Sequence, residues 1–186
     1  MRIRRCFLDL DGVLVDFLRG ALEACGAADM DYPKGQYWIE EVLGVTRADM
    51  WSRFGDLERF FSDLKWHRDG PEIWRLASDV FYKSDGQLWL LSTAHDGGVG
   101  ALGKVAWVTR NLGAEWADRL ILAWDKRFAA GPDNLLVDDC PANVDAFRAY
   151  GGQAVLVPRI HNPAEGDAVD VVRAAFLEHL AKEMMG

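Results

Sequence analysis

The stretch from Phe7 to Phe17, FLDLDGVLVDF, decides the fold predicted for this chain. An apolar run that begins at Ile3 ends in two aspartates separated by one residue, Asp9 and Asp11, and a glycine follows. In an extended strand the side chains alternate between faces, so both aspartates project from the same side at the carboxyl end of the strand. Two carboxylates held this close repel each other unless a cation lies between them. The stretch therefore predicts a metal site with one carboxylate left over for chemistry.

Short apolar runs recur downstream and alternate with helical patterns. We expect strands at Ile3–Leu8, Gln87–Ser92, Arg119–Ala123, Asn134–Val137 and Gln153–Val157, and helices at about 71–83, 99–112, 141–150 and 167–184. Strands that alternate with helices form a parallel sheet covered on both faces, and its ligands bind beyond the carboxyl ends of the strands. The sequence thus predicts an α/β fold with a Rossmann-like, doubly wound parallel sheet.

The interval from Asp16 to His67 breaks this alternation, because it holds helical patterns and no convincing strand. The helical stretches are Phe17–Gly26, Tyr37–Leu43, Arg47–Phe54 and Leu57–Leu64. We expect residues 1–15 and 68–186 to form the α/β core, and residues 16–67 to form a small helical cap over the strand ends. A small cap implies a small substrate.

Composition excludes several classes of partner. The chain has 186 residues, a formal net charge of -8 and a pI near 5.0. Nucleic acids and anionic membranes bind to clusters of lysine and arginine, so neither is expected as a partner of this acidic chain. The three cysteines, Cys6, Cys25 and Cys140, lack CxxC spacing, which argues against a disulfide framework and favours the reducing cytoplasm. No apolar run approaches the length of a membrane span.

Three more groups fall at the expected strand ends, in a set order. Ser92-Thr93 closes the second strand, Lys126 follows the third, and Asp138-Asp139 follows the fourth. With the first aspartate pair, this order resembles the haloacid dehalogenase superfamily of phosphotransferases, and the resemblance covers residues 3–15 and about 69–160. An alternative for Asp138-Asp139 alone is that it caps the helix that begins near Pro141.

The resemblance implies a role for each acidic residue. Asp9 is the nucleophile and carries the phosphoryl group as an acyl phosphate. Asp11 is the general acid for the leaving alcohol and the general base for the hydrolytic water. Mg²⁺ is held by Asp9, Asp138 and the backbone carbonyl of Asp11, while Asp139 orders a metal-bound water.

The remaining groups are expected to bind phosphate. Lys126 and the hydroxyl of Thr93 supply positive charge and a hydrogen-bond donor for the phosphoryl oxygens. Only one of two adjacent hydroxyls can point at the phosphate from a strand end, and we favour Thr93 over Ser92.

A closer resemblance is to the 5'(3')-deoxyribonucleotidase family. It rests on the strings DLDGVLVDF, GKVAWVTRNLG and LILAWDKRFAAGPDNLLVDDCP. By this resemblance Lys104 also approaches the phosphate, although a solvated helix face is an equal alternative. Aromatic side chains of the cap sandwich the base, with Phe60, Phe61 and Trp66 as candidates, and each stacked base gains about 1–3 kcal/mol. His161 is interpreted as part of a loop turn.

These observations predict a Mg²⁺-dependent phosphomonoester hydrolase acting through an aspartyl phosphate, a 5'-(deoxy)nucleotidase. One alternative is a phosphatase for another small ester, such as a sugar phosphate or phosphoglycolate. Another is a non-hydrolytic phosphoacceptor with a regulatory role, because receiver domains also place acidic residues, a hydroxyl and a lysine around magnesium. The expected partner is a nucleoside monophosphate, and a homodimer is left open.

Overall fold

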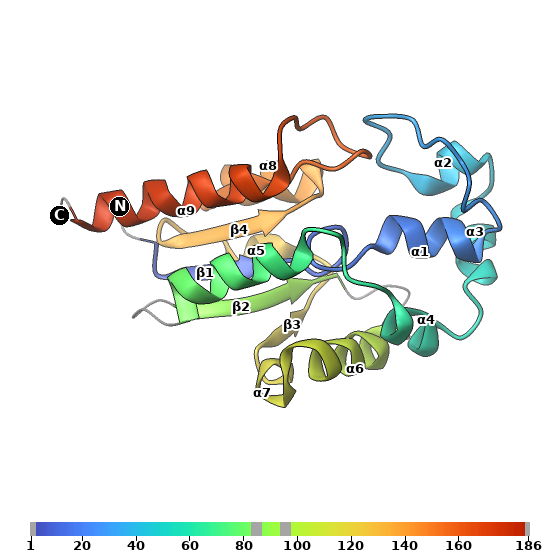
Figure 1. The fold of residues 1–186 in the computed structure, drawn as a ribbon, viewed down its shortest axis with the longest axis horizontal. Coiled ribbons are helices and arrows are strands. Elements are labelled where there is room, and N and C mark those ends of the chain that lie inside the picture. The colour runs from blue at the N-terminus through green and yellow to red at the C-terminus, as the bar shows by residue number, and fades with distance from the viewer. Residues whose placement is uncertain (1–2, 83–86, 94–97, 185–186) are drawn as a thin grey trace.

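A parallel β-sheet forms the centre of the molecule (Figure 1). The computed structural model describes residues 3–82, 87–93 and 98–184, with side chains through residue 178. Within these residues the sheet has the strand order β3-β2-β1-β4-β5. The strands are β1 Arg5–Leu8, β2 Gln87–Ser92, β3 Leu120–Leu122, β4 Asn134–Asp138 and β5 Gln153–Leu156. All five expected strands and the α/β class are confirmed.

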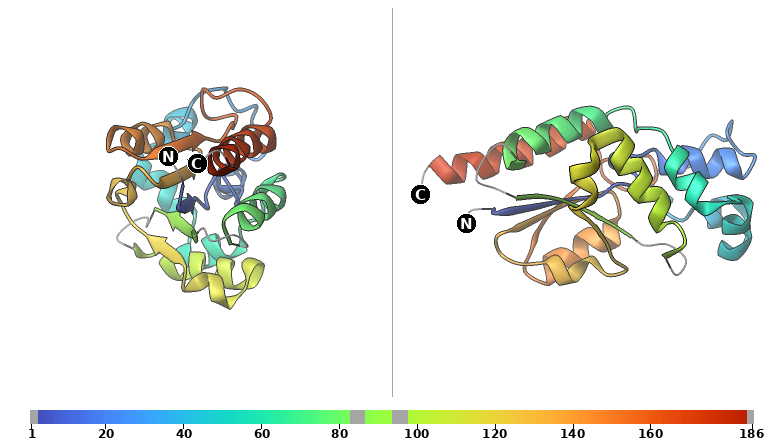
Figure 2. Two further views of the ribbon diagram at one scale, coloured as in Figure 1. Left: turned by 90° about the vertical axis from the view of Figure 1, so that its left-hand side faces the viewer. Right: turned by 90° about the horizontal axis from the view of Figure 1, so that it is seen from below.

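Helices cover both faces of the sheet, as Figure 2 shows. Cys6 and Leu8 of β1 join the apolar cluster on one face, whereas Phe7 between them joins the cluster on the other. This alternation follows from the period of two in a strand. The covering helices are α5 Gly70–Ala77, α6 Ala101–Leu112, α7 Ala114–Ala117, α8 Pro141–Ala149 and α9 Ala168–Met184. A π-helical turn, η1 Ser78–Tyr82, extends α5, and a 3-10 turn, η3 Lys126–Ala129, follows β3.

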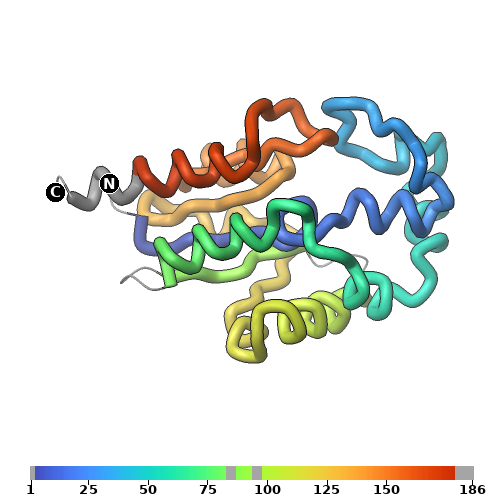
Figure 3. Tube along the Cα trace, viewed as in Figure 1, coloured from blue at the N-terminus to red at the C-terminus, as the bar shows by residue number. Residues whose placement is uncertain are grey.

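Four short helices lie beyond the carboxyl ends of the strands, as the path of the chain in Figure 3 shows. They are α1 Phe17–Ala24, α2 Ile39–Leu43, α3 Arg47–Arg53 and α4 Leu57–Asp63. Side chains cap three of them: Asp16 accepts from the Arg19 amide, Thr46 from the Asp49 amide and Asp56 from the Arg59 amide. The helices enclose an apolar cluster of their own: Ala21, Leu22, Tyr32, Ile39, Met50, Phe54 and Leu57.

The two connections between these helices and the sheet run side by side. Val15 on the outgoing connection forms an antiparallel bridge with Trp66 on the returning one. The amide of Asp16 donates to the carbonyl of Lys65 over 2.9 Å, and the amide of His67 donates to the carbonyl of Leu14 over 2.8 Å. The two connections between the helical segment and the core are therefore paired with each other, close to the end of β1. Among the helices in the described part of the chain, none is long and apolar enough to cross a membrane.

Candidate active site

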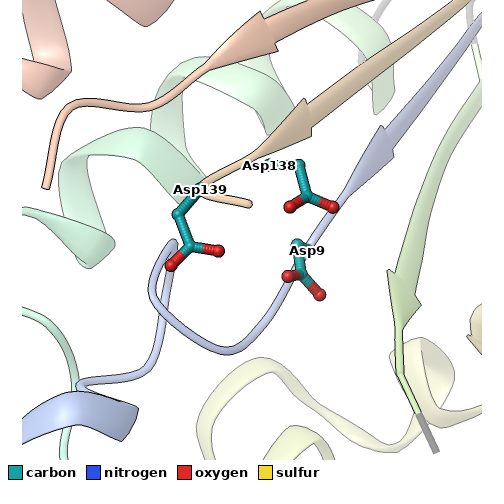
Figure 4. A group of neighbouring side chains, drawn as sticks. All are labelled: Asp9, Asp138 and Asp139. Carbon is teal, nitrogen blue, oxygen red and sulfur yellow. The ribbon is translucent and has the colours of Figure 1, made fainter. Parts of the chain in front are cut away.

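Three carboxylates meet at the carboxyl edge of the sheet (Figure 4). Asp9 directly follows β1, Asp138 ends β4, and Asp139 comes next along the chain. Because β1 and β4 are parallel neighbours, the Asp9 amide donates to the carbonyl of Val137 over 3.0 Å. All three aspartates are buried, and one oxygen of each lies within 4.8 Å of the others. Sequence positions almost 130 residues apart thus supply one cluster of negative charge.

A buried lysine neutralises part of this cluster. Lys126 comes from η3, and its Nζ lies 2.9 Å from Oδ1 of Asp9 and 2.7 Å from Oδ2 of Asp138. Burial raises the pKa of Asp9, and the neighbouring carboxylates raise it further against the opposing charge of Lys126. For Lys126 itself burial lowers the pKa, but the charges of Asp138 and Asp9 outweigh burial and raise it. The lysine is therefore held in its charged form.

The donor set fits a hard divalent cation. Oδ1 of Asp9 is a buried oxygen whose one close polar neighbour among the described residues is the Lys126 ammonium, 2.9 Å away in an ion pair. Three carboxylates and one ammonium leave the cluster short of positive charge. Magnesium prefers oxygen ligands of this kind. Asp9, Asp138 and Asp139 are thus the residues that could hold it.

Asp11 faces a different lysine. Lys104 lies on the buried face of α6, and its Nζ contacts Oδ2 of Asp11 and lies 2.9 Å from Oγ of Ser92. The close approach of α6 to α4 positions this lysine: a Cβ on Gly103 would lie 2.3 Å from the carbonyl oxygen of Glu58. The Lys104 side chain is only 2% exposed, so the solvated-face alternative is wrong.

The two neighbouring hydroxyls have different surroundings. Ser92 is fully buried and is bound by Lys104. Thr93 instead lines a cavity of about 360 Å³ together with Asp9, Asp11 and Asp139. This division agrees with the preference for Thr93 at the phosphate, which stays a prediction. The residues that follow, Ala94 to Gly97, lie outside the described part of the chain.

The cavity has an aromatic wall, but not the one expected from the sequence. Its aromatic lining residues are Phe17, Tyr37, Trp38, Trp51 and Trp124. Phe61 is buried, and the Lys104 ammonium lies 4.8 Å from the centre of its ring. Phe60 lines a separate groove formed by residues of α1 and α4. Trp66 donates to Asn111 over 3.0 Å and packs on Trp107. The structure thus places Phe60, Phe61 and Trp66 outside the cavity lining.

The structure adds groups that sequence reasoning did not assign. His161 is buried, and its Nε2 lies 2.6 Å from Oδ2 of Asp139. Asn162 donates to the backbone carbonyl of Asp139 over 2.8 Å. Asn143, in the first turn of α8, donates to both oxygens of Asp138 over 3.3 and 3.2 Å. The loop-turn interpretation of His161 missed this contact. In the sequence, only the position of this polar side chain close to the end of β5 could have indicated the contact with Asp139.

Helix α8 also shows how the acidic pair relates to a helix start. Oδ1 of Asp138 accepts from the amide of Cys140 over 2.8 Å, at the residue in the N-cap position of α8. Cys140, and neither aspartate, is the N-cap residue of α8, and the helix has no side-chain cap hydrogen bond. The capping alternative for Asp138-Asp139 is therefore wrong, and Asp138 belongs to the acidic cluster.

No protein-family profile matches the chain. Its fold matches solved haloacid dehalogenase-like proteins. One from Agrobacterium tumefaciens has a TM-score of 0.56 at 15% identity and covers 99% of this chain and 100% of its own. One from Streptococcus pneumoniae has a TM-score of 0.55 at 13% identity, and the match covers 97% of this chain and 98% of the other. A hydrolase from Deinococcus radiodurans, solved with bound phosphate and sodium, has a TM-score of 0.53 at 16% identity. The match covers 97% of this chain and 96% of the other.

The chain therefore has the haloacid dehalogenase fold. In sequence it is similar to the human mitochondrial 5'(3')-deoxyribonucleotidase, with 26% identity over 175 residues that cover 87% of this chain and 73% of the relative. Both resemblances seen in the sequence are thus confirmed: the fold, and the relationship to a deoxyribonucleotidase.

Proposed function

We propose that this protein is a magnesium-dependent phosphomonoesterase that acts through an aspartyl phosphate. The observation that carries the proposal is the unequal placement of the first two aspartates. Asp9 lies in the acidic cluster beside Lys126, whereas Asp11 pairs with Lys104, and both aspartates line the same cavity. Two carboxylates in different surroundings can take two different roles.

The reaction has two steps. The Asp9 carboxylate attacks phosphorus, a new O–P bond forms, the ester O–P bond breaks, and the leaving alcohol takes a proton from Asp11. A water molecule then attacks the aspartyl phosphate, Asp11 takes back a proton, and inorganic phosphate and free Asp9 result. Thr93 and Lys126 stabilise the phosphoryl oxygens, and Lys104 holds Asp11 in place.

Magnesium completes the charge balance. We propose that Asp9, Asp138 and Asp139 hold it, with the backbone carbonyl of Asp11 as a further ligand. When bound, it neutralises the negative charge of the phosphoryl group. The bound phosphate and sodium in the Deinococcus radiodurans neighbour support an ion and phosphate site in this fold.

The proposed substrate is a nucleoside monophosphate. A cavity of about 360 Å³ has carboxylates at one end and aromatic side chains along its wall, which suits a ligand with one phosphate and one flat ring. The human relative is named a 5'(3')-deoxyribonucleotidase. Residues 16–67 form the cap in this proposal, because Phe17, Trp38 and Trp51 of that segment line the cavity. They take the base-contacting role for which Phe60, Phe61 and Trp66 were the candidates.

The reaction is tested by measuring phosphate release. Purified protein with Mg²⁺ is incubated with nucleoside monophosphates, sugar phosphates and phosphoglycolate, and inorganic phosphate is quantified. Asp9→Asn removes the nucleophile and is expected to abolish turnover, whereas Asp145→Asn, an exposed aspartate on α8, serves as the matched control. Full turnover by Asp9→Asn contradicts the mechanism. Accumulation of a stable aspartyl phosphate without release favours the phosphoacceptor alternative.

The base contact is tested separately. Trp51→Leu is expected to raise KM for a nucleotide by about 5- to 150-fold, from the 1–3 kcal/mol of a stacked base. KM for a small alkyl phosphate should change little. Phe60→Leu, outside the cavity lining, is the control. Equal effects of Trp51→Leu on both substrates mean that Trp51 only packs the helical segment. The cytoplasmic location stays a prediction, and the possibility of a homodimer stays open.

A further inference from the structure

Arg159 is a buried cation that takes no part in the proposed reaction. It follows β5, and its side chain is only 4% exposed. The guanidinium donates to the backbone carbonyls of Gly12, Val13 and Pro158 and to both carboxylate oxygens of Asp69. The bonds to Asp69 are 2.9 Å each. A buried guanidinium that satisfies five acceptors has one defined orientation.

Two of these acceptors belong to the turn that carries Asp11. The turn is closed by its own hydrogen bonds, from the Gly12 amide to the carbonyl of Val15 over 2.8 Å and from the Val15 amide to the carbonyl of Leu10 over 2.9 Å. Those bonds fix the shape of the turn but not its place on the core. Arg159 supplies two hydrogen bonds from another segment of the core to the turn, at the two residues that follow Asp11.

The third acceptor group lies on the chain that returns from the helical segment. Asp69 precedes α5, yet its carboxylate makes no capping hydrogen bond to that helix. It binds Arg159 and also lies 2.7 Å from Nδ1 of His67. The amide of His67 in turn donates to the carbonyl of Leu14. One guanidinium therefore joins the turn, the returning connection and the end of β5.

We propose that Arg159 is a positioning residue that holds the turn carrying Asp11 against the returning connection. Arg159 itself neither lines the cavity nor belongs to the acidic cluster, so it acts through the backbone of Gly12 and Val13. Small misplacements of a reacting group can lower the rate about 100-fold. A lysine at this place retains the charge but cannot serve the same acceptors, because it lacks the planar fork.

The kinetic part of this inference rests on the proposed function. Arg159→Met is expected to lower kcat by about 10- to 100-fold and to leave KM within about twofold. Arg159→Lys should recover part of kcat. The control is Arg173→Met, which removes an exposed ion pair with Glu72 of 2.8 Å and should leave kcat unchanged. The assays are run at a temperature where circular dichroism shows each variant to be folded.

A second measurement does not need activity. Hydrogen exchange followed by mass spectrometry compares peptides that span residues 9–16 and 65–70 with peptides from the sheet. Arg159→Met is expected to speed exchange about tenfold in the first two and not in the sheet, and Arg173→Met in neither. If the wild type releases no phosphate, the proposed function fails and the exchange result still decides the role of Arg159.

Three outcomes would overturn the inference. One is unchanged kcat and unchanged exchange in a folded Arg159→Met protein. Another is faster exchange throughout the molecule, which indicates a general structural role. If Arg159→Met does not fold, Arg159→Lys carries the test, and wild-type kcat with wild-type exchange in that variant counts against the inference.

Discussion

Gly12 gives the sharpest test of how the first aspartate pair is built. Its φ of 75° lies in the left-handed region, and a Cβ added there would lie 1.8 Å from Oδ2 and 2.4 Å from Cγ of Asp139. Gly12→Ala therefore meets two separate costs. The left-handed conformation costs about 1–2 kcal/mol for a residue with a Cβ. The Asp139 carboxylate must also move away from His161, now 2.6 Å distant, at a cost of about 1.5–3 kcal/mol.

A second glycine separates the two costs. Gly151 has a φ of 86°, and its added Cβ meets no atom within 4 Å, so Gly151→Ala carries the conformational cost alone. Free energies of unfolding from urea titrations should show Gly12→Ala as the less stable variant by about 1.5–3 kcal/mol. This difference corresponds to about 3–12 °C in the melting temperature of a chain of this size.

A double variant completes the test. In Gly12→Ala combined with Asp139→Ala the carboxylate that obstructs the new methyl group is gone, so the effects of the two single changes should not add. Equal destabilisation by Gly12→Ala and Gly151→Ala would refute the clash. Strict additivity in the double variant would refute it as well.

Three further predictions concern the charges. Burial raises the pKa of Asp69, but the hydrogen bond from His67 and the charge of Arg159 outweigh burial and lower the pKa to about 2. The resulting stabilisation of about 2 kcal/mol is present above about pH 4 and is lost as the pH falls toward 2. In urea titrations, the difference in unfolding free energy between wild type and Asp69→Asn should therefore become smaller over that pH range. Lys126→Met leaves Asp9 and Asp138 buried without a cation and should lower the free energy of unfolding by about 3–5 kcal/mol. Lys104→Met leaves unpaired an aspartate that lines the cavity, and should lower the free energy of unfolding by about 1–3 kcal/mol. Equal losses in chemical denaturation would mean that the burial of the remaining aspartates is not the deciding factor. Mg²⁺ at 100 times its dissociation constant should stabilise the wild type by about 2.7 kcal/mol, and EDTA should remove this stabilisation. Asp138→Asn should not be stabilised by Mg²⁺. Thermal denaturation of both proteins with and without Mg²⁺ measures the difference.

The elements of the fold could be predicted from the sequence because each depends on local patterns. The β4 run NLLV is apolar after its first residue and becomes a strand buried along its whole length. Asp16, Thr46 and Asp56 precede apolar periodicity and become helix caps. The short helix α7 and the 3-10 turn η3 were not predicted, since four residues are too few to show a period.

The acidic cluster was also predictable, for a topological reason. Parallel strands end at one edge of the sheet, so aspartates that close β1 and β4 must meet if the two strands are neighbours. The structure shows them as neighbours. Lys126 follows β3, two strands away from β1, and reaches the cluster through the 3-10 turn.

The sequence by itself determined the FLDLDGVLVDF strand end, the class of sheet and the order of the groups along its edge, because strand periodicity and parallel pairing act over short distances or follow a general rule. Only the tertiary structure decided which aromatic side chains line the cavity and that Lys104 is buried against Asp11. It also decided that His161 reaches Asp139 after β4 and that Arg159 reaches the turn after β1. Those contacts depend on the angles at which helices pack and on the paths of loops. Such angles arise from the whole set of packed side chains and leave no periodic trace in the sequence.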